Sequence, residues 1–393
     1  MKICYVNPTN NIRRPIAELA TILAQQGHQI SIMYPLSKEC PTKNWVANDT
    51  VEKQQIKKKP VASWYFAPLR YSFPRPIKLW KETRSMFKEN DLIHIWEYYY
   101  PISVFPLLYA LFSGQRKKVI LTTDGFVGYS YKPKEPRWLV PGFKLYTLFL
   151  GRWLFKIPRM MTTYGKAMLP FAKRAGVPMN KLMVLSTGIH LDKFKNINLD
   201  KINKIKEEFK IGSEKIILFV GMLTERKGVD KVINISIQLL DEGENIKTIL
   251  VGDAHGENIF RKMVPEKYKE KIIFSGGRKE IGEFMNLASV LLLPSEGEGL
   301  PGVVMEAMAS GLAVVATEEG CTPDLIDKER GGFLVNNGDY YQHLKKIIVD
   351  EELKHQLQQK GKEKIKDFSW TVVAERYRQL YQTTGESHSP RKG

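Results

Sequence analysis

Cysteine is scarce in this sequence of 393 residues, and the spacing of the few cysteines does not suggest disulfide bonds. Cys4, Cys40 and Cys321 are far apart, and none belongs to a CxxC motif. The sequence therefore indicates neither a disulfide framework nor a zinc site, and it favours a reducing, cytoplasmic environment. The first residues, MKICYVNP, already have the pattern of a strand, so we expect no signal peptide.

Long hydrophobic runs and paired acidic motifs are also missing. No uncharged run approaches the roughly 18 residues of a membrane-spanning helix. No Asp-x-Asp motif occurs, which disfavours a diphosphate held by a divalent metal. We therefore expect a metal-independent protein with no bound cofactor.

Acidic residues are outnumbered by basic ones. Lys and Arg number 60 against 42 Asp and Glu, which gives a formal net charge of +18. Such a surplus attracts anionic membranes, phosphorylated substrates or nucleic acid. Because no zinc-finger, RRM or basic-zipper motif is present, we expect no nucleic-acid partner. A solvated, Lys-rich surface without a function is the alternative.

Basic and aromatic residues gather between residues 131 and 159. Apolar residues recur there every three or four positions, while basic residues occupy another helical face: Phe143, Tyr146, Leu150, Leu154 and Ile157 against Lys144, Arg152 and Lys156. This pattern predicts a helix in the membrane interface, so we expect peripheral binding to anionic membranes through residues 137–159. A core helix with a basic outer face would show the same pattern.

Short apolar segments alternate with helical patterns along most of the chain. One series runs from ICYV (3–6) to MVLST (183–187), and a second runs from IILFV (216–220) to GFLV (332–335). Uniformly apolar strands alternating with helices predict an α/β protein with two doubly wound, Rossmann-like domains. We place these at residues 1–190 and 191–365, followed by a helix over 366–384 and a disordered tail over 385–393. Residues 35–90 show no such pattern, and we expect an irregular insertion there.

Ligands of open α/β sheets bind beyond the carboxyl ends of the strands, so the residues after each strand are the candidates for a site. After IILFV, Gly221 permits a tight turn, and Arg226 and Lys227 follow it. Cations at this position suit a diphosphate.

The segment PSEGEGLPGVVMEAMASG (294–311) follows another apolar strand. A helix is expected from Gly302 to Gly311, with its positive end toward the strand ends. Glu298 precedes the helix and Glu306 lies about one turn inside it. Carboxylates would repel a phosphate that they touched, so we expect them to accept hydrogen bonds from the hydroxyls of a sugar and a ribose. The pattern thus predicts a nucleotide-sugar site, whereas two solvated helix-start residues are the alternative.

The E-x7-E spacing of Glu298 and Glu306 resembles the motif of the retaining glycosyltransferases of family 4, the group 1 glycosyltransferases with the GT-B fold. FVGMLTERKGVDKVI and SGGRKEIGEFMNLASVLLLPS resemble the phosphate loop and the base-side segment of that family. The resemblance implies an acceptor-side N-terminal domain, a donor-binding C-terminal domain and a C-terminal helix that crosses back. The implied donor is a UDP- or GDP-sugar.

The resemblance also implies roles for single residues. Glu306 would hold the ribose, Glu298 the donor sugar, and Lys227 with Arg226 the diphosphate. The other implied donor contacts are Gly221, Met222, Gly277, Arg278, Gly299, Leu300, Pro301, Gly302 and Val303. The implied acceptor-side contacts are Asn10, Asn11, Arg13, His94 and Asp124. Met222 stands where the family usually has arginine, and Asp124 where it often has histidine. A packed strand histidine is an equal alternative for His94.

The implied reaction is hexosyl transfer from a nucleotide diphosphate to a hydroxyl, with retention at the anomeric carbon. A lipid-linked saccharide, glycolipid or polysaccharide precursor at the cytoplasmic face of the membrane is the expected acceptor. Three alternatives are open: a glycoside hydrolase, which would act without nucleotide; a nucleotide-sugar epimerase, which would need no acceptor; and a non-catalytic basic protein that binds membrane or nucleic acid.

Overall fold

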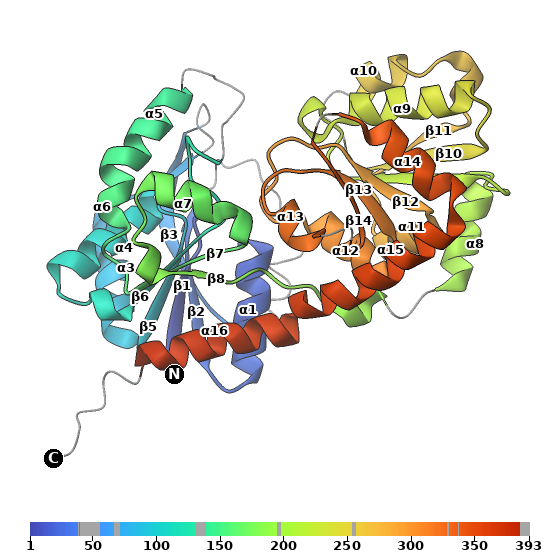
Figure 1. Ribbon diagram of the computed structural model, residues 1–393. Coiled ribbons are helices and arrows are strands. Elements are labelled where there is room, and N and C mark those ends of the chain that lie inside the picture. Colours follow the sequence, from blue (N-terminus) through green and yellow to red (C-terminus); the bar gives the residue numbers. More distant parts are fainter. Residues whose placement is uncertain are drawn as a thin grey trace. The chain divides into compact units, whose positions relative to one another are not determined.

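The protein consists of two compact units, described here from a computed structural model. The described residues are 1–37, 39, 56–66, 71–130, 139–194, 198–253, 257–327, 330–336 and 338–385. Unit 1 comprises Met1–Gly188 and Trp370–Gly393, and unit 2 comprises Ile189–Ser369. Each unit is built on a mainly parallel sheet with helices packed against it (Figure 1). The divisions predicted from the sequence lie after residue 190 and before residue 366.

The sheet of unit 1 has the order β4-β3-β2-β1-β5-β6-β7-β8. Only the β3–β4 pair is antiparallel in the described part of this sheet. The strands are β1 (Lys2–Val6), β2 (Gln29–Leu36), β3 (Lys57–Phe66), β4 (Tyr71–Pro74), β5 (Leu92–Trp96), β6 (Val119–Thr123), β7 (Met160–Thr163) and β8 (Leu182–Val184). The helices are α1 (Arg14–Gln25), α3 (Pro76–Glu89), α4 (Pro101–Phe112), α5 (Leu139–Tyr146), α6 (Arg152–Leu154), α7 (Leu169–Ala175) and α16 (Trp370–Gly385). The order reverses between β1 and β5, whose strand ends therefore flank a natural binding position.

The prediction of an irregular insertion over residues 35–90 is wrong for the described part of that range. Strand β3 begins in the basic run 57–59, and helix α3 follows β4 directly. The burial of β3 alternates along the strand, because it lies toward the sheet edge with one face covered. Lys59 is buried there and pairs with Glu89 at 2.6 Å. A search for continuous apolar runs misses such a strand. Residues 38, 40–55 and 67–70 lie outside the described residues.

Helix α16 packs against α1 within unit 1 (Figure 1). Its buried residues Tyr377 and Tyr381 share a hydrophobic cluster with Ile3 and Tyr5 of β1. The predicted C-terminal helix that crosses back is therefore confirmed: the chain closes the first unit with its last helix.

The sheet of unit 2 is parallel throughout its described strands, in the order β11-β10-β9-β12-β13-β14. The strands are β9 (Lys215–Val220), β10 (Ile246–Val251), β11 (Ile272–Gly276), β12 (Val290–Leu293), β13 (Ala313–Thr317) and β14 (Gly332–Val335). The helices are α8 (Leu199–Glu208), α9 (Val229–Asp241), α10 (Glu257–Lys262), α11 (Ile281–Leu287), α12 (Gly302–Ser310), α13 (Thr322–Leu325), α14 (Tyr340–Val349) and α15 (Glu351–Lys364). This is the Rossmann strand order, which reverses between β9 and β12.

Candidate functional site

The two loops that the sequence singled out follow β9 and β12, the strands at the reversal point of unit 2. Close backbone packing brings the loops together. Gly228 has φ +72°, and a Cβ there would lie 2.3 Å from the carbonyl oxygen of Pro294. Only glycine permits this conformation at this distance, so the sequence fixes the approach of the two loops.

The loop after β9 presents one side chain to the site and uses another to hold the neighbouring loop. Arg226 donates to the carbonyl oxygens of Glu296 and Gly297, at 3.2 and 3.1 Å. Lys227 instead reaches Glu298, with its Nζ 2.5 Å from Oε1. Gly221 turns the chain away from β9 with φ +154°, and Met222 after it is exposed. The structure thus separates the two cations that the sequence grouped together.

The loop after β12 is braced from several sides before α12 begins. The Glu319 carboxylate accepts the N–H of Gly297. The N–H of Cys321 donates to the carbonyl oxygen of Gly299 at 2.8 Å. Together with the Arg226 contacts, these bonds fix the backbone on both sides of Glu298. A loop held in this way presents its side chains in one arrangement before any ligand arrives.

Glu298 lies at the centre of the loop with two polar partners. Its Oε1 accepts from Lys227 and, at 2.6 Å, from the hydroxyl of Ser295. The Glu298 side chain is only 12% exposed and that of Lys227 18% exposed, so water screens the pair weakly. The sequence predicted both residues as site residues, but their pairing depends on tertiary placement.

Helix α12 begins beside this pair. Pro301, its N-cap, supplies no side-chain hydrogen bond to the first turn. The N–H of Val304 donates to the carbonyl oxygen of Pro301 at 3.1 Å, so the N–H groups that suit an anion are those of the first two helical residues, Gly302 and Val303. The backbone from Gly299 to Val303 forms this helix start, with Leu300 and Val303 packed partly against the core and Gly302 as the first helical residue. Glu306 lies one turn further along and is half-buried. The arrangement offers an anion cradle flanked by two carboxylates.

Gly277 and Arg278 follow β11, two strands from the reversal point. The N–H of Gly277 donates to Asp253 Oδ1 at 3.1 Å, and a Cβ at this glycine would meet the same atom at 2.5 Å. Arg278 is turned toward α8, where its guanidinium pairs with Glu208 and lies 5.3 Å from the ring centre of Phe209. The structure therefore gives Arg278 structural partners on α8.

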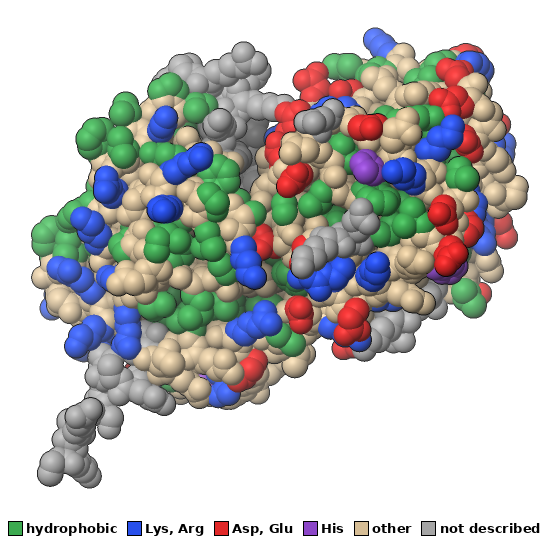
Figure 2. Space-filling model, viewed as in Figure 1, with side chains coloured by type: hydrophobic (Ala, Val, Ile, Leu, Met, Phe, Trp, Pro, Cys, Tyr) green, Lys and Arg blue, Asp and Glu red, His purple; other side chains and the backbone are tan. Residues whose placement is uncertain are grey.

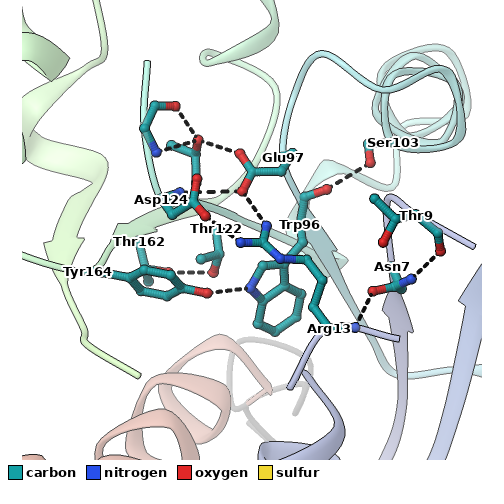
Figure 3. A network of polar contacts seen from close by, with 12 residues as sticks. Asn7, Thr9, Arg13, Trp96, Glu97, Ser103, Thr122, Asp124, Thr162 and Tyr164 are labelled. Atoms are coloured by element: carbon teal, nitrogen blue, oxygen red, sulfur yellow. Dashed lines mark hydrogen bonds and ion pairs between the residues drawn. The ribbon is translucent and has the colours of Figure 1, made fainter. Parts of the chain in front are cut away.

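A second polar cluster occupies the reversal point of unit 1 (Figure 3). Arg13, which precedes α1, donates to Glu97 Oε1 at 2.7 Å and also pairs with Asp124. Glu97 follows β5 and is fully buried, whereas the Arg13 and Asp124 side chains are 27% and 28% exposed. Burial, followed by the charge of Asp124, raises the pKa of Glu97 to about 8. Burial would also raise the pKa of Asp124, but Arg13 lowers it below its ordinary value.

The predicted acceptor-side residues do not all lie in this cluster. Arg13 and Asp124 do, and the sequence analysis missed Glu97. Asn10 instead bridges Ser72 and the backbone of Ser37, at 2.7 and 3.2 Å. The backbone carbonyl of Asn11 closes the turn by accepting from Asn7 at 3.0 Å.

His94 has no route to an acceptor, which corrects its acceptor-side assignment. Its ring is fully buried in β5. The Nδ1 atom lies 2.6 Å from the hydroxyl of Tyr381, and Nε2 lies 2.6 Å from that of Thr122. Burial holds the pKa of His94 well below its ordinary value. This is the packed strand histidine of the alternative interpretation.

Within the described ranges, no three His, Cys, Asp or Glu side chains are grouped so as to hold a metal ion. No helix among those residues is long and apolar enough to cross a membrane.

Two Rossmann-like units with a closing C-terminal helix define the GT-B fold, and solved structures confirm this class. A glycosyltransferase from Rickettsia africae superposes with a TM-score of 0.77 at 18% identity, covering 99% of both chains. The Anabaena protein HepE in complex with UDP and glucose superposes with a TM-score of 0.73 at 16% identity, covering 98% of this chain and 100% of that one.

Part of the chain also matches a sequence family. Residues 200–364 match the family described as glycosyl transferases group 1. The capsular polysaccharide biosynthesis glycosyltransferase CapM of Staphylococcus aureus is 26% identical, over 62% of this chain and 67% of that one. An N,N'-diacetylbacillosaminyl-diphospho-undecaprenol alpha-1,3-N-acetylgalactosaminyltransferase of Campylobacter jejuni is also 26% identical, over 58% and 61%. Residues 200–364 therefore resemble the group 1 glycosyltransferases, and the two matches cover 67% and 61% of these relatives' lengths.

Proposed function

We propose that the protein transfers a sugar from a nucleoside diphosphate to a hydroxyl acceptor, with retention of configuration and without a metal. The observation that carries this proposal is the grouping of Lys227, Glu298 and the start of α12 at the reversal point of unit 2. One cation and one helix N-terminus suit the diphosphate. Glu298 and Glu306 suit the hydroxyls of the sugar and the ribose.

The chemical step breaks the bond between the anomeric carbon and the diphosphate oxygen, whose electron pair leaves with the phosphate. The acceptor oxygen bonds to the same face of the anomeric carbon, and its proton passes to the departing phosphate oxygen. Lys227 and the N–H groups of α12 stabilise the negative charge that grows on the leaving group. Glu298 stabilises the positive charge that grows on the sugar ring. No protein nucleophile is needed.

We further propose a UDP- or GDP-sugar as donor and a lipid-linked saccharide or related glycan precursor as acceptor. HepE is a GT-B structure in complex with UDP, which supports a uridine nucleotide. The Campylobacter relative bears a name that includes a diphospho-undecaprenol acceptor, and CapM acts in capsular polysaccharide biosynthesis. The first name supports a lipid-linked acceptor, and the second supports glycan assembly.

A lipid carrier requires that the enzyme reach a membrane, and the segment from α5 to α6 supports this. Its inner face is pinned within unit 1: Thr147 contacts the Tyr98 hydroxyl at 2.8 Å, and Leu154 is fully buried. Its outer face exposes large apolar side chains beside Lys144, Arg152 and Lys156: Leu145, Leu148, Phe149, Leu150 and Trp153. On the face that Figure 2 shows, Lys and Arg intermingle with hydrophobic side chains over unit 1. Residues 137 and 138 lie outside the described residues.

We therefore expect the protein to bind anionic vesicles peripherally, at the cytoplasmic face of a membrane in the cell. Each cation near an anionic surface contributes about 1 kcal/mol, and salt weakens this attraction. In a flotation assay at low salt, the protein should float with anionic vesicles. Replacing both Phe149 and Trp153, 71% and 42% exposed, by glutamate should abolish flotation.

Ile259 provides the matched control, because it is 66% exposed but lies on α10 of unit 2. Ile259→Glu should float like the parent protein. Flotation that is absent at low salt, or equally lost in this control, would argue against the α5–α6 segment as the membrane contact.

The donor is tested by thermal unfolding with a panel of UDP-, GDP- and ADP-sugars. A donor at 100 times its dissociation constant should add about 2.7 kcal/mol to the free energy of unfolding. The donor that stabilises the protein is then incubated with lipid-linked acceptors, and the anomeric configuration of the product is read by NMR. No stabilisation by any nucleotide sugar would contradict the proposal.

A further inference from the structure

The Arg13–Glu97–Asp124 cluster contains more acidic charge than its surroundings can accommodate. Glu97 has no exposed surface, and Asp124 shares its only cationic partner in the cluster, Arg13. Among the described residues, the other titratable groups that face Glu97 are Tyr98, Tyr99 and Tyr100 after β5, whereas Tyr164 after β7 faces Arg13 and Asp124. Burial raises the pKa of each of these tyrosines, so they remain uncharged. Within the part of the chain that the structure describes, one cation of this cluster thus faces two carboxyl groups.

The hydrogen bonds of Thr123 indicate how this imbalance is resolved. Its Oγ1 lies 2.7 Å from Glu97 Oε2 and 2.7 Å from the carbonyl oxygen of Gly125. A hydroxyl carries a single proton, and a carbonyl oxygen carries none. If the Thr123 proton is donated to Gly125, the contact with Oε2 is a hydrogen bond only when Glu97 itself carries a proton. A proton on Glu97 would allow both 2.7 Å contacts to be hydrogen bonds, whereas an ionised Glu97 leaves one of the two without a proton.

The backbone at Glu97 is also unusual. Its φ is +61°, in the left-handed region that residues with a Cβ rarely adopt. The N–H of Glu97 donates to the carbonyl oxygen of Thr122 at 2.8 Å, which holds this conformation at the end of β5. The side chain is thereby directed toward Arg13 and Asp124 (Figure 3). Strained conformations of this kind are concentrated at functional sites.

We propose that Glu97 is a positioning residue which, as an uncharged carboxylic acid, holds Arg13 and Asp124 in place to receive a hydroxyl of the saccharide acceptor. Arg13 and Asp124 are the partly exposed members of the cluster, so they are the ones that reach the acceptor. With Glu97 neutral, Arg13 and Asp124 balance one another in charge. Ionised Glu97 would compete with Asp124 for Arg13 and add a buried negative charge. The acceptor-positioning role rests on the proposed function. The protonation state of Glu97 is independent of it.

The protonation is tested without any assay of activity. Infrared difference spectra of the parent should contain a carboxylic-acid C=O band at neutral pH that disappears near pH 8, following the pKa of Glu97. The band should be missing from Glu97→Gln. It should persist in Glu89→Gln, a matched control in the same unit whose carboxylate pairs with Lys59. A band that is absent from the parent at pH 7, or present in Glu97→Gln, would overturn the proposal.

Thermal unfolding gives a second readout that also requires no substrate. Because the pKa of Glu97 is raised in the folded state, its proton stabilises the fold at low pH. That contribution is lost as the pH rises from the ordinary range of a carboxyl group through about 8. The Tm of Glu97→Gln should therefore increase relative to the parent between pH 6 and pH 9. If the difference in Tm between Glu97→Gln and the parent stays the same from pH 6 to pH 9, Glu97 is not protonated in the folded protein.

The positioning role is tested by the pH profile of transfer. For the parent, kcat/KM for the acceptor should fall about tenfold per pH unit above pH 8, as for a single ionisation. Glu97→Gln keeps a neutral side chain of the same shape, so it should stay active at pH 7 and lose this alkaline fall. Donor affinity, which depends on unit 2, should be unchanged in both proteins.

The outcomes separate the two proposals. If the parent transfers sugar but Glu97→Gln keeps the alkaline fall, Glu97 does not position the acceptor site. If the parent transfers no sugar from any donor, the proposed function fails, and the positioning role fails with it. The infrared and unfolding results then still decide whether Glu97 is protonated.

Discussion

Replacing Lys227 by alanine should slow sugar transfer by roughly 10²-fold or more, which is the loss expected for a group that stabilises a leaving diphosphate. Lys227 is only 18% exposed and lies beside the start of α12, so its charge acts in a weakly screened environment. The measurement is the rate of acceptor glycosylation at saturating donor. The loss should appear in kcat, because the charge on the leaving group grows in the transition state.

Lys231 provides the control for this variant. It lies four residues after Lys227, on α9, and its Nζ lies 3.2 Å from Glu296 Oε1, in a pair that is well exposed. Lys231→Ala should therefore retain most of the activity. Lys227→Ala also deprives Glu298 of its cation, so the double variant Lys227→Ala/Glu298→Gln is needed to separate the two effects. The double variant should remain slow, and parental turnover in Lys227→Ala would remove Lys227 from the reaction.

Substitution of Glu298 by glutamine should lower turnover by roughly tenfold or more while changing donor affinity little. A carboxylate near the sugar stabilises the positive charge that develops on the ring, and an amide does not. The substitution preserves the shape of the side chain and its bond to Ser295, so the fold should be maintained. The measurement is kcat, together with the dissociation constant of the donor.

Glu296→Gln is the matched control, since its side chain pairs with Lys231. Equal losses in Glu296→Gln and Glu298→Gln would indicate a general effect of charge in this loop. A Glu298→Gln variant that turns over at the parental rate would exclude a direct role for that carboxylate.

The architecture could be predicted because it is encoded in local patterns. Buried parallel strands such as β5 and β6 are uniformly apolar segments, and their alternation with helices implies doubly wound units. The same patterns also showed where each strand ends. The residues that follow the carboxyl ends of β9 and β12 could therefore be identified as candidates for the site. Strand β3 was missed because only alternate residues are buried there.

The pairing of side chains could not be predicted, since it depends on where distant loops meet. Arg226 and Lys227 are neighbours in sequence, yet one braces the backbone of the next loop and the other pairs with Glu298. Lys227 was selected because it lies in the segment after a buried strand. The same rule would have selected Glu97, since Glu97 directly follows the buried strand β5. The residue predicted from that strand was instead His94, whose ring is fully buried.

The most direct test of a nucleotide-sugar site is calorimetric titration of the stabilising donor into the parent, Glu306→Gln and Glu296→Gln. A carboxylate that accepts a hydroxyl bond contributes roughly 1–2 kcal/mol more than an amide, so Glu306→Gln should bind the donor about tenfold more weakly. Glu296→Gln should bind like the parent, and all three should bind one donor per chain. Parental affinity in Glu306→Gln, or no binding to the parent, would contradict the assignment of this site to a nucleotide sugar.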